Sequence, residues 1–189
     1  MRRLLAAVAL LAVAGGVAFW LLEETMPSWY AKQRYPLRYA AIVRGHAENY
    51  NLDPSLLAAV IYTESKFDAT TVSGAGAVGL MQLLPDTAKG IAARTGGSRF
   101  VVSDLRDPEI NVRYGAWYLE HLREKYRGRE NAMDLALAAY NAGQGRVDEW
   151  IRESPAGQPV RIRFAETRAY IDRVRDLSEI YRRTYASLR

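Results

Sequence analysis

Glu64 is the residue of this sequence best suited to acid chemistry. It follows an apolar run and shares a helical face with Val60 and Ile61, which precede it by four and three residues. A carboxylate on an apolar face is costly to ionise, so we expect its pKa to lie above the usual value of about 4.3. A carboxylic acid that keeps its proton near neutral pH can act as a general acid. The structural alternative is a buried Glu64 that is paired with an arginine.

Three neutral hydrogen-bonding residues lie downstream of Glu64. Gln82 follows a glycine-rich turn in Gly79-Leu80-Met81-Gln82, and the other two stand in Ala139-Tyr140-Asn141-Ala142-Gly143. Neutral polar groups of this kind line sugar-binding sites, although each of them alone is more often structural. Their presence favours the functional interpretation of Glu64.

Common glycosidase mechanisms use a second carboxylate, and the sequence offers two weak candidates for it. Asp68 follows Glu64 by four residues, beyond the expected end of the helix, where a short acid usually caps or turns the chain. Asp86 stands in the first turn of the next expected helix, where the helix dipole favours its charge. Neither is placed for nucleophilic attack, and we find no Ser/His/Asp arrangement.

The glycine-rich stretch Gly74-Ala75-Gly76-Ala77-Val78-Gly79 matches the dinucleotide-binding fingerprint in its letters. That fingerprint must follow a strand and open a helix, whereas a helix and a polar loop precede it here. We therefore interpret it as a close-packed turn that lets the backbone approach a ligand.

Helical signals dominate the chain and predict an all-α fold. Asp followed by Pro marks helix starts at Asp53 and Asp107, Pro85 starts another helix, and Gly143 is the expected end signal of a helix over 131–142. A last long helix is expected over 166–186. The best strand candidate is the short segment 160–164.

The composition limits the chemistry that the chain can perform. It has no cysteine and two histidines, which excludes disulfides and thiolate metal sites and argues against a histidine-rich metal site. We expect no cofactor and no metal. The net charge of +5 comes mostly from the arginine-rich C-terminal segment, whose charges are interleaved with acids; we interpret that segment as a solvated helix face rather than a nucleic-acid surface.

The N-terminus predicts a membrane segment. Arg2-Arg3 precedes an uncharged run from Leu4 to Leu22, which as a helix spans about 28 Å, close to the hydrocarbon thickness. The charge order places the following body outside the cytoplasm. We therefore predict a signal-anchor over 1–25, a juxtamembrane linker over 26–36 and a catalytic domain over 37–189. The alternative is a cleaved signal peptide that leaves a secreted or periplasmic protein.

Taken together, these motifs resemble the lytic transglycosylases of the soluble-lytic-transglycosylase (SLT) type, glycoside hydrolase family 23, which are distantly similar to goose-type lysozyme. The resemblance covers about Pro36 to Tyr181 and implies a lysozyme-like globular helical domain. The matching stretches stand in the family's order: Val60 to Phe67, Ser73 to Ala88, Leu105 to Val112, Ala138 to Gly143 and Glu166 to Ile171. Leu84 departs from the methionine that the family often has before the proline.

The resemblance implies the roles of individual residues. Glu64 stands at the position of the catalytic acid, which protonates the glycosidic oxygen between N-acetylmuramic acid and N-acetylglucosamine in peptidoglycan. Tyr170 is expected near Glu64, where it helps to orient it. The residues expected to line the saccharide cleft are Ser65, Met81, Gln82, Tyr140, Asn141 and Tyr170.

The sequence thus predicts a membrane-anchored peptidoglycan lytic transglycosylase that forms 1,6-anhydromuramyl products on the extracytoplasmic side of a cell membrane. The alternatives are a hydrolysing muramidase on the same fold and a non-catalytic peptidoglycan-binding protein. The expected partners are glycan strands and, through the N-terminal helix, the membrane. No nucleic-acid partner is expected, and no protein partner is identified.

Overall fold

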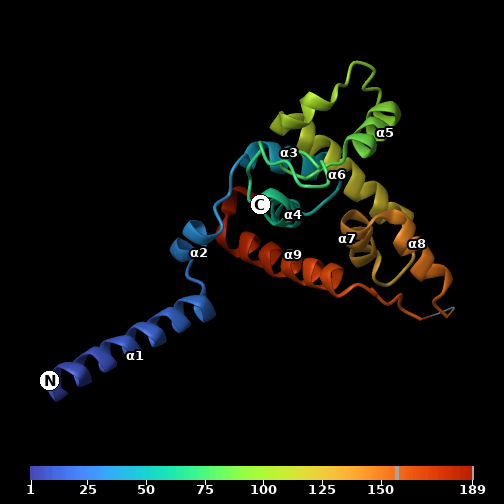
Figure 1. The fold of residues 1–189 in the computed structure, drawn as a ribbon. Coiled ribbons are helices and arrows are strands. Elements are labelled where there is room, and N and C mark those ends of the chain that lie inside the picture. The colour runs from blue at the N-terminus through green and yellow to red at the C-terminus, as the bar shows by residue number, and fades with distance from the viewer. Residues whose placement is uncertain (156–157, 189) are drawn as a thin grey trace. The chain divides into compact units, whose positions relative to one another are not determined.

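The computed structural model describes residues 1–155 and 158–188, with the backbone alone at positions 2, 4 and 6–8. The described residues are almost entirely helical and contain no strand, only isolated bridges between Val72, Val78 and Leu83. The elements, shown in Figure 1, are α1 (Arg2–Thr25), α2 (Ser28–Arg34), α3 (Ala40–Asn49), α4 (Pro54–Ser65), α5 (Pro85–Thr95), η1 (Val102–Arg106), α6 (Pro108–Lys125), α7 (Ala132–Ala142), α8 (Gln144–Arg152), α9 (Ala165–Thr184) and η2 (Ala186–Leu188).

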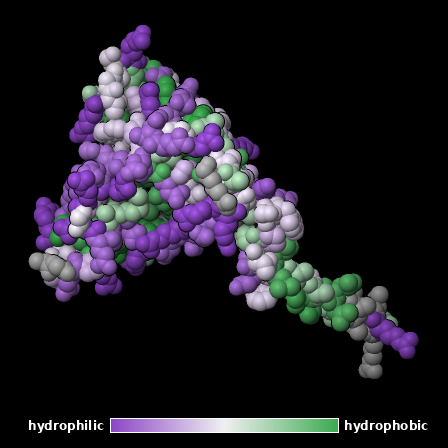
Figure 2. Space-filling view, turned by 180° about the vertical axis from the view of Figure 1, so that it is seen from behind, coloured by the Kyte–Doolittle hydropathy of each residue, from purple (hydrophilic) through white to green (hydrophobic). Residues whose placement is uncertain are grey.

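The chain forms two compact units, Met1–Pro36 and Leu37–Arg189. In the first unit, Met26 adopts a left-handed conformation at the end of α1, and Pro27 precedes α2. The segment predicted as a linker therefore contains a short helix. Figure 2 shows that hydrophobic residues gather along α1, whereas the visible face of the second unit is mostly hydrophilic.

The helices of the described residues agree only in part with the predicted membrane span. None of the helices is by itself long and apolar enough for a membrane crossing, but Ala9–Thr25 and Ser28–Arg34 together reach the required length and composition, with a bend of 90° between them. The side chains at positions 4 and 6–8, which belong to the predicted span, are not among those that the structure describes. The single-pass anchor remains a prediction.

Helix α4 is bounded by signals that lie within a few residues of its ends. The Asp53 carboxylate accepts hydrogen bonds from the backbone N–H groups of Ser55 (2.7 Å) and Leu56 (3.4 Å) at the start of the helix. At its other end Lys66 and Phe67 both have positive φ angles, of 53° and 64°. This sharp reversal ends the helix directly after Glu64 and Ser65, because consecutive left-handed residues cannot continue a right-handed helix.

The longest helix of the second unit, α9, packs along α4, and the two helices lie side by side (Figure 1). Its inward residues include Ile171, Val174 and Leu177, which are almost completely buried. Tyr181 from α9 is fully buried and contacts Tyr62 and Phe67 from the α4 region through edge-on rings. These contacts fix α9 against the end of α4, where Glu64 stands.

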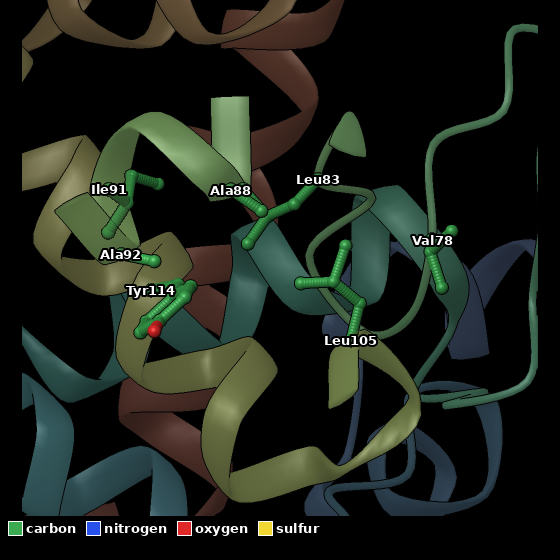
Figure 3. Packing of buried hydrophobic residues seen from close by; sticks show 7 residues of the cluster. All are labelled: Val78, Leu83, Ala88, Ile91, Ala92, Leu105 and Tyr114. Atoms are coloured by element: carbon green, nitrogen blue, oxygen red, sulfur yellow. The ribbon is translucent and has the colours of Figure 1, made fainter. Parts of the chain in front are cut away.

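A separate apolar cluster holds the region between α5 and α6. Figure 3 shows its members, which come from the loop after α4, from α5, from η1 and from α6: Val78, Leu83, Ala88, Ile91, Ala92, Leu105 and Tyr114. Two partly buried aromatic residues, Tyr118 and Tyr140, pack against this cluster. The cluster thereby positions two rings that recur at the candidate site.

The loop between α4 and α5 is held in shape by Asn111, a fully buried residue of α6. Its Nδ2 group donates to the carbonyls of Val78 (2.9 Å) and Leu105 (2.8 Å), and its Oδ1 atom accepts from the N–H of Met81 (2.8 Å). Gly79 has a φ of 82° and packs so closely on Asn111 that a Cβ atom would collide with it. A buried amide that satisfies three backbone groups is a strong structural constraint.

The predicted helical class is confirmed, and most helix starts agree with the sequence signals. The Asp107 carboxylate caps α6 by accepting from the N–H groups of Glu109 (2.8 Å) and Ile110 (3.2 Å). The segment 160–164, which was the best strand candidate in the sequence, forms no strand. In its place the chain is irregular, and the guanidinium of Arg168 donates to the carbonyls of Ile162 (2.7 Å) and Arg163 (2.8 Å).

We predict that Asn111→Ala lowers the free energy of unfolding by about 2–4 kcal/mol, because it leaves buried backbone groups without partners. Chemical denaturation followed by circular dichroism measures the change. Asn49→Ala removes an exposed asparagine at the end of α3 and serves as the control, with an expected change below about 0.5 kcal/mol. Equal stability of the two variants would contradict the role assigned to Asn111.

Candidate active site

A cavity of about 390 Å³ lies between the loop after α4, the end of α7 and one side of α5 and α6. Four residues predicted for the site line it: Glu64, Gln82, Tyr140 and Asn141. The glycine-rich turn contributes Ser73, Ala75 and Ala77 to its wall. The predicted site residues Ser65, Met81 and Tyr170 are not part of this lining.

Glu64 stands in the last turn of α4 and is held by one hydrogen bond. The hydroxyl of Tyr170, from α9, donates to Glu64 Oε1 at 2.7 Å across 106 residues of sequence. Burial raises the pKa of Glu64 from its ordinary 4.5 to about 7, although the hydrogen bond from Tyr170 favours the charged form and opposes this rise. The carboxyl group is therefore poised to give up a proton near neutral pH.

Among the residues that the structure describes, no opposing charge locks Glu64 in the ionised form. None of the ion pairs among the described residues includes it. Within that part of the chain it is also the only carboxylate in the cavity lining. Asp68 lies outside the lining and accepts from the N–H and hydroxyl of Thr70, while Asp86 pairs with Lys89 at 3.1 Å.

Two tyrosines that line the cavity form an aromatic wall. Tyr140 from α7 and Tyr118 from α6 have ring centroids 5.6 Å apart. The hydroxyl of Tyr140 donates to the carbonyl of Met81 at 2.7 Å. Burial, reinforced by the nearby Glu64, raises the pKa of Tyr140 well above its usual range, so the hydroxyl stays protonated and keeps this bond.

Gln82 and Ser65 use their polar groups to hold backbone. The amide Nε2 of Gln82 donates to the carbonyls of Gly79 (2.9 Å) and Thr71 (3.1 Å), which fixes the turn while its side chain lines the cavity. The hydroxyl of Ser65 donates to the carbonyl of Leu80 at 2.8 Å and is buried. Ser65 thus ties the end of α4 to the loop from behind the cavity wall.

Met81 and Asn141 differ in how far they reach the cavity. Met81 is fully buried, and its side chain packs against Gly115 of α6, where a Cβ atom would collide with it. Asn141 is exposed at the end of α7 and lines the cavity, and its Oδ1 atom accepts from the hydroxyl of Thr167 at 2.9 Å. Met81 therefore has the surroundings of a packing residue.

The structure adds residues to the site that the sequence reasoning did not single out. Tyr118, Thr87 and Leu84 line the cavity, and Asn111 supports it from the core. Asn111 follows Asp107 in the motif Asp107-Pro108-Glu109-Ile110-Asn111, and a polar residue on an otherwise apolar helix face was the signal that could have identified it.

Comparisons with known proteins agree with this geometry. The Transglycosylase SLT domain family matches residues 41–160. The soluble lytic murein transglycosylase of Escherichia coli (strain K12) is 31% identical over 160 residues, which cover 81% of this chain and 24% of that protein. The membrane-bound lytic murein transglycosylase C of Edwardsiella ictaluri is 34% identical over 193 residues, which cover 88% of this chain and 52% of that protein.

Solved structures show the same fold. The 70 kDa soluble lytic transglycosylase of Escherichia coli superposes with a TM-score of 0.72 at 30% identity and covers 82% of this chain. An inactive mutant of the lytic transglycosylase Slt of Pseudomonas aeruginosa gives a TM-score of 0.70 at 30% identity, with 83% of this chain covered. The alignments take in about a quarter of each of these two structures, 25% and 26%.

The chain likewise spans about a quarter of the length of the soluble relatives that it matches, 24% in each case. The family match nevertheless covers most of this chain, from the start of α3 to the segment after α8. The chain therefore belongs to the transglycosylase SLT domain family and has its lysozyme-like, all-helical fold.

Proposed function

We propose that this chain is a lytic murein transglycosylase, which cleaves the β-1,4 bond between N-acetylmuramic acid and N-acetylglucosamine and forms 1,6-anhydromuramyl ends. One observation carries the proposal: a single carboxyl group with a pKa of about 7 lines a cavity that holds no other carboxylate among the described residues. The family match and the names of the relatives support the same activity.

In the first half of the reaction Glu64 acts as the general acid. Its proton passes to the glycosidic oxygen as the bond from the muramyl C1 carbon to that oxygen breaks, and N-acetylglucosamine leaves with a free hydroxyl. The 2-acetamido group of the muramyl residue stabilises the positive charge on C1. Tyr170 donates to the newly formed Glu64 carboxylate and stabilises it.

In the second half the substrate supplies its own nucleophile. The muramyl 6-hydroxyl attacks C1, and its proton passes to the Glu64 carboxylate, which restores the neutral acid. No water is consumed, so the product keeps a 1,6-anhydro ring. A nucleophile that is part of the bound sugar is already held close to C1, which explains why one carboxylate suffices.

We further propose that the catalytic unit acts outside the cytoplasm and that residues 1–25 anchor it as a single membrane-crossing helix. The apolar composition of α1 and the membrane-bound relative support this location. Trp29 and Tyr30 stand in α2, shortly after the apolar stretch in the sequence, and aromatic residues favour a membrane interface. Loss of the segment by signal cleavage is the competing outcome.

The first test concerns the products of the reaction. Digestion of purified sacculi by the full chain should give muropeptides with anhydro ends, which are lighter by one water than reducing ends in mass spectrometry. Glu64→Gln should lower turnover by at least about a thousandfold while saccharide binding persists, because the amide has no proton to give.

The matched control is Glu109→Gln, which removes an exposed carboxylate that pairs with His46 outside the cavity lining. We expect it to retain activity. Reducing ends in place of anhydro ends would identify a hydrolysing muramidase, and unchanged turnover by Glu64→Gln would refute the assigned role of Glu64.

The second test concerns the protonation of Glu64 without reference to turnover. Because burial raises its pKa from 4.5 to about 7, the folded chain keeps a proton that the unfolded chain loses in this pH range. The resulting stabilisation is fully present below pH 4.5 and is lost as the pH rises through 7. Glu64→Gln cannot ionise, so its stability relative to wild type should rise by up to about 3 kcal/mol between pH 4 and pH 8.

Calorimetric unfolding of both proteins across this pH range measures the difference. Asp86→Asn, which removes an exposed carboxylate, should show no comparable rise relative to wild type. A difference between wild type and Glu64→Gln that stays constant with pH would contradict the raised pKa.

The third test concerns the anchor. The full chain should sediment with membranes in high salt, because burial of apolar side chains is insensitive to screening. A chain that lacks residues 1–36 should be recovered in the soluble fraction of the same extract. Release of the full chain with a shortened N-terminus would show cleavage of the segment and would refute the uncleaved anchor.

A further inference from the structure

Arg94 is an exposed cation in the last turn of α5, and it forms no hydrogen bond or ion pair with the residues that the structure describes. Some exposed arginines of this unit are paired, as Arg175 is with Asp134 at 2.6 Å and Arg163 is with Glu153, whereas others, such as Arg152, resemble Arg94 in having no such partner among the described residues. A cation in the last turn of a helix interacts favourably with the helix dipole, and this alone could explain Arg94. Its position relative to the cavity points to a second role.

The face of α5 that carries Arg94 begins at the cavity. Thr87 lines the cavity, and Arg94 follows it by seven residues, which places the two on the same side of the helix, about 10 Å apart along the axis. Ala88, Ile91 and Ala92 are turned into the apolar cluster, which fixes the rotation of the helix (Figure 3). Arg94 is therefore directed along the cavity side of α5.

The surface between Thr87 and Arg94 is open. Gly90 stands between them on the same side of α5, and a Cβ atom built there would meet nothing within 4 Å. An extended group that leaves the cavity beside Thr87 can pass over Gly90 and reach the guanidinium without displacing a side chain.

Tyr118, which belongs to α6, relates Arg94 to the cavity wall. Tyr118 lines the cavity and stacks obliquely on Tyr140. Burial raises the pKa of Tyr118, and the positive charge of Arg94 partly offsets this rise. The exposed Arg94 thus acts electrostatically on a residue that lines the cavity.

We propose that Arg94 binds a carboxylate of the peptide stem that the glycan strand carries on its muramic acid residues. This inference rests on the proposed function, since it assigns a second contact to the same substrate. A guanidinium binds a carboxylate through two parallel N–H···O bonds and stays charged at every physiological pH. Apart from Glu64, the cavity lining carries no acidic side chain among the described residues that would repel an approaching anion.

The test measures binding rather than turnover and uses the full chain with Glu64→Gln. The two ligands are a GlcNAc–MurNAc tetrasaccharide with tetrapeptide stems and the same compound with its stem carboxylates converted to amides. We expect Arg94→Ala on this background to weaken binding of the carboxylate ligand about three- to tenfold and to leave binding of the amidated ligand within twofold. Isothermal titration calorimetry supplies both dissociation constants.

Two matched variants separate charge from stability. Arg94→Lys on the same background keeps the charge but loses the two-pronged geometry, so it should recover part of the preference for the carboxylate ligand. Arg152→Ala removes an exposed arginine at the end of α8, outside the cavity lining, and should change neither constant. The Glu64→Gln protein with Arg94 intact should also lose part of its preference for the carboxylate ligand over the amidated ligand as the salt concentration rises.

Equal weakening of both ligands by Arg94→Ala would overturn the inference, since it would show a structural effect through α5. An unchanged constant for the carboxylate ligand, or no binding of either ligand to the Arg94 protein, would overturn it as well. Because turnover is not measured, a chain that releases no anhydro products from sacculi can still show the Arg94-dependent preference. Failure of the proposed function and failure of this inference are therefore distinguishable.

Discussion

The rest of the site depends on the burial of one carboxyl group among neutral partners. Desolvation penalises the Glu64 anion, and a single donor, the hydroxyl of Tyr170, partly compensates it. With no donor, the acid would hold its proton too tightly; with an arginine in contact, it would have none to give. The positions of α4 and α9 have to be exact enough to keep this balance, and the buried contacts around Tyr181 and Phe67 provide that rigidity.

Most polar side chains around the cavity act on the backbone. Ser65, Gln82 and Tyr140 each donate to a carbonyl of the loop between α4 and α5, and Asn111 binds the same loop from the core. The loop has no regular secondary structure to satisfy its peptide groups, so side chains must do so. A cavity wall built from such a loop can be closely shaped and still hold its form.

The sequence predicted the parts of the structure that depend on near neighbours. The caps at Asp53 and Asp107 and the end signal at Gly143 act over two to four residues, and the helical spacing of Val60, Ile61 and Glu64 is also local. The buried position of Met81 depends on Gly115, and the support from Asn111 depends on a loop thirty residues earlier in the chain. The segment over 160–164 has the composition of a strand but lacks a neighbouring strand, and Arg168 takes two of its carbonyls instead.

The bond between Glu64 and Tyr170 joins two positions that are 106 residues apart, and α9 leaves the ribosome after α4 and α8. A nascent chain that ends at α8 has the acid but lacks the phenol and the helix that bury it. Its carboxyl group would be hydrated and would titrate as an ordinary glutamate. Competence for acid chemistry thus requires α9, so that translation order itself delays it until this helix has been made.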